Sequence, residues 1–133
     1  MPRMASDDLI ALAAEEFVSL TTFRRNGIGV PTTVWVARDA DRLVVTTGAD
    51  SGKVKRIRRN PAVTLRPSDR AGRVDPGAAI VSATATIQHD VDEIERCTAL
   101  FHAKYGLQAR MILGLGRVLS RDGRNRVLLH LEG

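Results

Sequence analysis

Apolar and polar residues alternate with a period of two along several short segments of the chain. This alternation predicts strands at Phe17–Arg25, Gly29–Ala37, Arg42–Thr47, Val63–Arg66, Ala79–His89 and Arg126–Leu131. The pair Asn26-Gly27 between the first two segments is a strong hairpin signal, and Asp39-Ala40-Asp41 predicts the next turn. We therefore expect the first three strands to form a meander.

Other segments carry helical spacing. Ser6–Glu16 has an apolar stripe, Asp90–Tyr105 begins with a capping residue and ends before a glycine, and a short basic helix follows Asp50-Ser51. Leu107–Leu119 is apolar but interrupted by glycines, which predicts a broken helix, and Asp122-Gly123 predicts a turn. Strands joined mainly by short turns favour a mainly β fold, a closed or half-closed antiparallel barrel of six strands with a few flanking helices.

Length and composition predict a single domain over residues 1–133 with a real hydrophobic core. The N-terminus lacks the apolar core of a signal peptide and no apolar run approaches the ~18 residues of a membrane span, so we expect a cytoplasmic protein. Cys97 is the one cysteine, which excludes an internal disulfide framework and a cysteine-based zinc site. Its helical context favours a buried thiol over a nucleophile.

The formal net charge of +5, from 20 basic and 15 acidic side chains, favours an anionic partner. Much of the positive charge is concentrated in Lys53, Lys55, Arg56, Arg58 and Arg59. No aromatic residue is interleaved with this cluster and aromatics are only 4% of the chain, whereas recognition of single-stranded nucleic acid uses stacking on aromatics. A small anionic ligand is therefore favoured over nucleic acid.

The basic cluster lies within Thr46–Pro61, where a predicted strand leads through a glycine-containing turn into the basic helix. Asp50 or Ser51 can cap the helix, Gly52 allows a ligand to approach the backbone, and Lys53 adds a positive charge beside the positive helix end. This combination suits a phosphate. An ordinary solvated basic helix explains the same residues equally well at this point.

The sequence gives little support for a metal site or for the common nucleotide-binding folds. The three histidines, His89, His102 and His130, share no short metal-binding spacing, so we expect no metal site and interpret them as surface or packed residues. The chain has no G-x-G-x-x-G and no Walker loop, which excludes the common dinucleotide and nucleoside-triphosphate folds. A bound cofactor could supply the chemistry, or the chain could be a plain binding module.

Four motifs in order resemble one known family. They are G-V-P-T-T-V-W-V-A at Gly29–Ala37, the stretch L-V-V-T-T-G-A-D-S-G-K-V-K-R-I-R-R-N-P-A-V-T-L at Leu43–Leu65, D-R-A-G-R-V at Asp69–Val74 and K-Y-G at Lys104–Gly106. The series resembles the pyridoxamine-phosphate-oxidase-like flavin/deazaflavin oxidoreductases, which form split β-barrels. It is most similar to the actinobacterial branch that uses coenzyme F420.

The resemblance implies a homodimer with two cofactor sites at the subunit interface. The residues expected to flank the tricyclic ring, mostly through backbone groups, are Thr32, Thr33, Val34 and Trp35, and Thr46, Thr47 and Gly48. The residues expected at the cofactor phosphate are Ser51, Gly52 and Lys53, with Arg56 one helical turn further on. Arg58 and Arg59 could attract the glutamate tail of the deazaflavin. The partners implied are a second copy and a small-molecule substrate, with neither nucleic acid nor membrane.

The implied activity is hydride transfer from reduced coenzyme F420 to an electron-poor double bond, as in an enone, quinone or tetrapyrrole, with no catalytic side chain assigned. Relatives that hold flavin mononucleotide (FMN) usually have further basic residues at the positions of Thr32, Thr33 and Val34, which favours the deazaflavin. Leu107 stands where similar sequences tend to have a tryptophan, which leaves the substrate end of the pocket undefined. The alternatives are an FMN oxidoreductase, a non-catalytic carrier of a cofactor or haem-type ligand, and a nucleic-acid-binding domain.

Overall fold

A computed structural model describes residues 5–106 and 126–133, and the segments Leu107–Leu119 and Asp122-Gly123 lie outside this range. The helices are α1 (Ala5–Ala11), the 3₁₀ helix η1 (Leu12–Ala14), α2 (Gly52–Arg59) and α3 (Val91–Tyr105). The strands are β1 (Phe17–Phe23), β2 (Gly29–Val34), β3 (Ala37–Asp39), β4 (Arg42–Gly48), β5 (Ala62–Ser68), β6 (Val81–Gln88) and β7 (Arg126–Glu132). Within the described residues, no helix is both long enough and apolar enough to cross a membrane.

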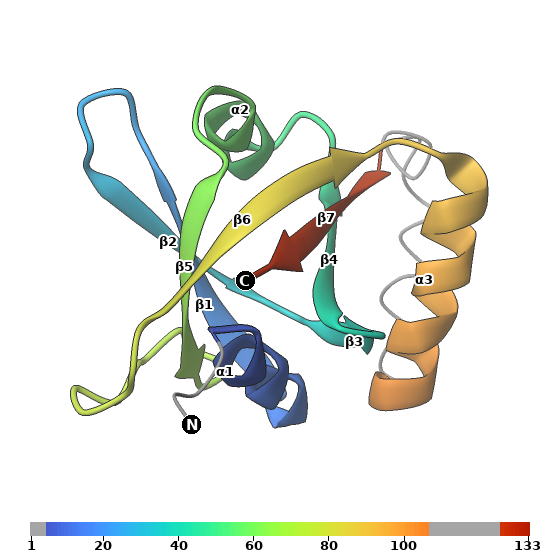
Figure 1. Ribbon diagram of the computed structural model, residues 1–133, viewed down its shortest axis with the longest axis horizontal. Coiled ribbons are helices and arrows are strands. Elements are labelled where there is room, and N and C mark those ends of the chain that lie inside the picture. Colours follow the sequence, from blue (N-terminus) through green and yellow to red (C-terminus); the bar gives the residue numbers. More distant parts are fainter. Residues whose placement is uncertain (1–4, 107–125) are drawn as a thin grey trace.

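All seven strands of the described residues form one antiparallel sheet in the order β2-β1-β5-β6-β7-β4-β3, which curls into a half-barrel (Figure 1). The predicted mainly β, antiparallel split barrel is confirmed, with seven strands instead of six. The additional strand arises because the predicted strand Gly29–Ala37 is broken. Its first part pairs with β1, and β3 pairs with β4 at the opposite edge of the sheet.

The break lies at Trp35-Val36, which carries the chain from one edge of the sheet to the other. The predicted meander of three strands is therefore wrong, because β2 does not pair with β4. The cause lies outside the local pattern. The Val36 amide donates to the Tyr105 hydroxyl at 3.2 Å, so a side chain from α3 takes the place of a neighbouring strand.

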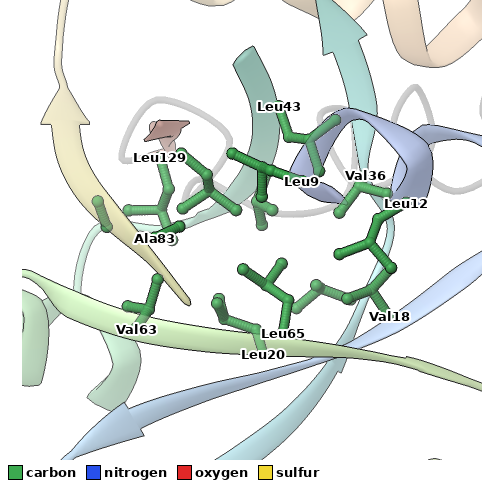
Figure 2. Close-up of a cluster of buried hydrophobic side chains, with 14 of the residues drawn as sticks. Leu9, Leu12, Val18, Leu20, Val36, Leu43, Val63, Leu65, Ala83 and Leu129 are labelled. Atoms are coloured by element: carbon green, nitrogen blue, oxygen red, sulfur yellow. The ribbon is translucent and has the colours of Figure 1, made fainter. Parts of the chain in front are cut away.

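Inward-facing apolar side chains fill the half-barrel, and α1 and η1 cover its open side (Figures 1 and 2). The alternation in β1 and β5 directs every second residue inward, as expected for a sheet with one buried face. The labelled members of this core in Figure 2 are Leu9, Leu12, Val18, Leu20, Val36, Leu43, Val63, Leu65, Ala83 and Leu129.

A second apolar cluster lies between α3 and the outer face of β3, β4 and β7. Cys97 and Phe101 of α3 are fully buried there against Val44 and Leu128. The neighbouring strands β4 and β7 are thus covered on both faces. The predicted burial of the Cys97 thiol is confirmed.

Candidate anion-binding site

The start of α2 is built by residues that directly follow β4. The Ser51 hydroxyl oxygen accepts a hydrogen bond from the Val54 amide at 3.4 Å, and the Thr47 hydroxyl lies 3.4 Å from it. The Ser51 amide donates to the Gly48 carbonyl at 3.1 Å. Of the two predicted capping residues, Ser51 is the one that caps. The backbone N–H groups of the first turn have no acceptors within the helix, and they lie at its positive end.

The apolar positions of α2 anchor it across the end of the half-barrel. Val54 and Ile57, three residues apart, are buried in the main core. This orientation leaves Lys53 and Arg56 partly buried at the margin of the packed face, while Lys55, Arg58 and Arg59 are exposed. The basic helix is therefore not uniformly solvated.

Arg56 folds back over the first turn of its own helix. Its Nε donates to the hydroxyl oxygen of Thr22, a fully buried residue of β1, at 2.6 Å. A Cβ atom at position 52 would lie only 2.8 Å from Arg56 Nη1. The glycine thus leaves space for the guanidinium group at the positive end of α2.

Lys53 faces two further positive side chains. Burial lowers its pKa first, and the positive charges of Arg56 and Arg126 lower it further. Arg126 of β7 donates through Nε to the Thr46 hydroxyl at 3.1 Å, and burial lowers its pKa as well. Within residues 5–106 and 126–133, none of these three cations forms an ion pair, so an anion placed among them would relieve their mutual repulsion.

A cavity of about 530 Å³ lies on one side of α2. The cavity is lined by residues from the tip of the β1–β2 hairpin and from the exposed side of the helix, and none of them is acidic. The lining residues are Arg24, Arg25, Asn26, Gly52, Lys55, Arg56 and Arg59. The hairpin turn was predicted from Asn26-Gly27 and is confirmed, with Gly27 at φ 88°. Arg24 and Arg25 were missed, because their place beside α2 depends on the sheet order.

The predicted ring-flanking residues fall into two groups. Thr46, Thr47 and Gly48 on β4 lead directly into the start of α2. On β2, Thr32, Thr33 and Val34 pair instead with Leu20, Ser19 and Val18 of β1. Four strands separate β2 from β4 in the sheet.

The side chain of Trp35 is directed to α3, where its ring stacks on Tyr105 with centroids 4.2 Å apart. The expected contact of Trp35 with the cofactor ring, through its backbone, stays a prediction. The Tyr105 hydroxyl also lies 2.7 Å from the Glu16 carbonyl, and Lys104 donates to the carbonyls of Glu15 and Val36 at 2.6 and 2.7 Å. The K-Y-G motif therefore ties α3 to the segment before β1 and to the segment between β2 and β3.

The D-R-A-G-R-V motif forms a turn beside β2. Asp69 accepts hydrogen bonds from the amide and the Nε of Arg73, both at 2.8 Å. Gly72 has φ 84°, and a Cβ there would lie 2.6 Å from the Thr33 hydroxyl oxygen. The motif thus packs a glycine tightly against one of the predicted site residues.

Comparison with protein families gives one match over nearly the whole chain. The model for pyridoxamine 5'-phosphate oxidase matches residues 8–132. No curated protein matches the chain in sequence.

Solved structures share the fold at low identity. An F420 reductase is 20% identical, with a TM-score of 0.60 over 99% of this chain and 94% of that one. A conserved hypothetical protein, Rv2991 of Mycobacterium tuberculosis, is 18% identical, with a TM-score of 0.68 over 98% and 80% of the two chains. HutZ, a haem storage protein of Vibrio cholerae, is 13% identical, with a TM-score of 0.67 over 98% and 90%. At these identities the likeness establishes the fold and does not separate an enzyme from a storage protein.

Proposed function

Because the chain belongs to the pyridoxamine 5'-phosphate oxidase family, we propose that it binds coenzyme F420 and acts as a reductase of electron-poor small molecules. The observation that carries the proposal is the cluster of Lys53, Arg56 and Arg126 around the start of α2, which forms no ion pair within the described residues. A phosphate group would supply the missing negative charge.

The residues fit the cofactor's anionic parts. Ser51, Gly52 and Lys53 would hold the phosphate, and Gly52 lacks the Cβ that would displace the Arg56 guanidinium. The adjoining cavity, with five cationic side chains in its lining, would receive the glutamate tail. Arg24 and Arg25 join Arg59 as candidates for the tail, whereas Arg58 does not line the cavity.

The absence of basic side chains at Thr32, Thr33 and Val34 favours the deazaflavin over FMN. When bound, the cofactor supplies hydride transfer to an electron-poor double bond. The chain's own residues bind its phosphate and tail, orient its ring and exclude water from it.

We further propose that the protein works as a homodimer. Within one chain, Thr32–Trp35 and Thr46–Gly48 belong to strands near opposite ends of the sheet order. A two-fold partner could place the first group of one protomer beside the second group of the other. The cofactor site would then be complete only at the interface.

The test is a fluorescence titration with coenzyme F420 on the parent protein and on Lys53→Ala. Loss of a charge-assisted contact to phosphate weakens binding by about 1.5–3 kcal/mol, or roughly 10- to 150-fold. The matched control is Arg58→Ala, which removes an exposed charge from the same helix outside the cavity lining and should change affinity little. Equal binding by Lys53→Ala would refute the phosphate assignment.

Parallel titrations distinguish the alternatives. Tight FMN binding without affinity for F420 would support a flavin oxidoreductase. Tight haem or cofactor binding without turnover of enones, quinones or tetrapyrroles would support a carrier. Affinity for duplex DNA that falls steeply with salt, without cofactor binding, would support a nucleic-acid-binding domain.

A further inference from the structure

A second group of reactive side chains lies between α3 and β7 and includes none of the residues assigned to the cofactor. It consists of the Glu93 carboxylate, the Cys97 thiol and the His130 imidazole, whose donor atoms all lie within 4.8 Å of one another. Glu93 and Cys97 are one helical turn apart on α3 and so share a face of the helix. His130 reaches them from the neighbouring strand β7.

His130 supplies the observation that points to a ligand. The residue is only 4% exposed, and its Nε2 is buried without a hydrogen-bond partner. Glu93 Oε1 lies 3.9 Å from this nitrogen, which is beyond hydrogen-bonding distance. Buried polar atoms are rarely left unpaired in folded proteins. Burial lowers the pKa of His130 and so favours the neutral imidazole, the form that binds metals.

The Cys97 sulfur faces the same space. It lies 3.9 Å from Glu93 Oε1 and 4.0 Å from Asp39 Oδ2. Burial raises the pKa of the thiol, so without a metal it stays protonated and unreactive. Formation of a sulfur–metal bond would release this proton to solvent.

Two arginines hold the third group, the Glu93 carboxylate, in place. Glu93 accepts from Arg96 at both carboxylate oxygens and from Arg42 Nη2 at 3.3 Å. With the Cys97 thiol, which approaches Oε1 at 3.9 Å, these make four hydrogen bonds on a carboxylate that offers about four acceptor positions. Metal binding would remove the thiol proton and so free the position that it occupies. Arg42 and Arg96 would therefore orient the carboxylate as outer partners of a bound metal.

The charge around the cluster is close to balanced before any metal binds. Asp39 from β3 and Glu93 from α3 face Arg42 from β4 and Arg96 from α3. Glu132 from β7 lies 3.8 Å from Arg42. The three carboxylates exceed the two arginines by one negative charge. A divalent cation that displaces the thiol proton adds one net positive charge, which this excess negative charge would balance.

We propose that Glu93, Cys97 and His130 form a binding site for a divalent transition metal of the zinc class, with water in the fourth position. Mixed oxygen, sulfur and nitrogen donors are the ligands such ions prefer. A tetrahedral zinc ion places these donors about 3.4–3.6 Å apart. The two separations from Glu93 Oε1 are 3.9 Å, and the separation between the Cys97 sulfur and the His130 nitrogen is within 4.8 Å, so the three side chains would need to move closer together on metal binding. The proposal departs from the expectation of no metal site, which was drawn from the single cysteine and the spacing of the histidines. That reasoning misses a mixed site in which two ligands come from a helix and one from a distant strand.

The probe is Co²⁺ added under reducing conditions to the full, tag-free chain. We expect visible bands of tetrahedral cobalt together with a near-ultraviolet charge-transfer band from the thiolate, release of one proton per metal bound, and loss of the bands when Zn²⁺ is added. Cys97→Ser should abolish the charge-transfer band. His130→Asn should weaken cobalt binding by at least about tenfold.

The matched control is His102→Asn, which removes an exposed histidine of the same helix and should leave the spectrum and affinity unchanged. Either ligand variant could fail to fold, and the parent protein then decides the question by itself. A parent without a thiolate-to-cobalt band at millimolar Co²⁺, or one whose metal binding releases no proton, would overturn the proposal. A band that survives His130→Asn at full affinity would also overturn it.

Discussion

Arg96 forms a bidentate ion pair with Asp39, from Nη1 to Oδ1 at 3.0 Å and from Nη2 to Oδ2 at 2.8 Å, although 57 positions separate the two residues. Arg42 also donates to Asp39 Oδ2, at 3.0 Å from Nη2 and 3.1 Å from Nε. The Asp39 side chain is only 12% exposed, so the pair attaches α3 to the β3–β4 hairpin at a place that solvent screens weakly.

The first prediction concerns stability in acid. Hydrogen bonds from Arg96, then from Arg42, lower the pKa of Asp39 from 3.8 to about 2 against the opposing effect of burial. Because the folded-state pKa is the lower one, the stabilisation is fully present above pH 3.8 and is lost as the pH falls toward 2. It amounts to at most about 2 kcal/mol, since Arg96 is half exposed.

Urea unfolding of Asp39→Asn should therefore show a loss of up to about 2 kcal/mol at pH 7. The difference from the parent should shrink at the acid end of the range. Asp41→Asn removes an exposed carboxylate from the same turn and serves as the control. A difference that stays constant down to the acid limit would contradict the assignment.

The second prediction concerns the Tyr105 hydroxyl, which accepts from the buried Val36 amide. Tyr105→Phe keeps the ring stacked on Trp35 but leaves that amide without its partner, which should cost about 1–3 kcal/mol in urea unfolding. Lys104→Met removes donors from carbonyls that water can reach in part, so its cost should be smaller. Equal stability of Tyr105→Phe and the parent would show that the amide finds another acceptor.

The third prediction separates folding from ligand binding at Gly52. Alanine fits the helical backbone, which by itself would stabilise the chain by about 0.4–1 kcal/mol, and loss of the hydrogen bond from Arg56 to the buried Thr22 hydroxyl would offset that gain. Its Cβ would nevertheless force the Arg56 guanidinium away, because Nη1 lies 2.8 Å from that position. We expect a nearly unchanged melting temperature together with weaker F420 binding. Gly77→Ala, where the nearest side-chain atom to a new Cβ is 3.7 Å away, is the control.

The fourth prediction concerns the hairpin tip. Arg25→Glu places a negative charge in the lining of the cavity beside α2. Affinity should fall more for F420 with a long glutamate tail than for F420 with a single glutamate, and the difference should diminish at high salt. Isothermal titration calorimetry with each of the two cofactor forms measures the affinities of the parent and of Arg25→Glu. An equal fall for both forms would place the tail elsewhere.

Local signals in the sequence predicted the turns and helix ends well. Asn26-Gly27 forms its hairpin, Ser51 and Asp90 cap their helices, and Gly106 ends α3 with φ 58°. Each of these depends on one or two residues and their own backbone. Such features can be predicted from the sequence without knowing which strands pair.

The pairing of the strands could not be predicted from local signals in the same way. The pattern of Gly29–Ala37 is continuous, and its break at Trp35-Val36 depends on Tyr105, which is remote in sequence. The candidate site shows the same division. The residues around Lys53 were predicted from one contiguous motif, whereas Arg126 joins them only because β7 pairs with β4.

The position of β7 also bears on how the protein is made. This strand lies between β6 and β4, so the sheet is divided between these two strands until residues 126–132 have left the ribosome. Until then β4 and β6 each present an unpaired edge, and Leu129 is missing from the core. Nascent chains should therefore be prone to aggregation until β7 emerges, and a stop codon before β7 should give aggregates rather than a smaller folded protein.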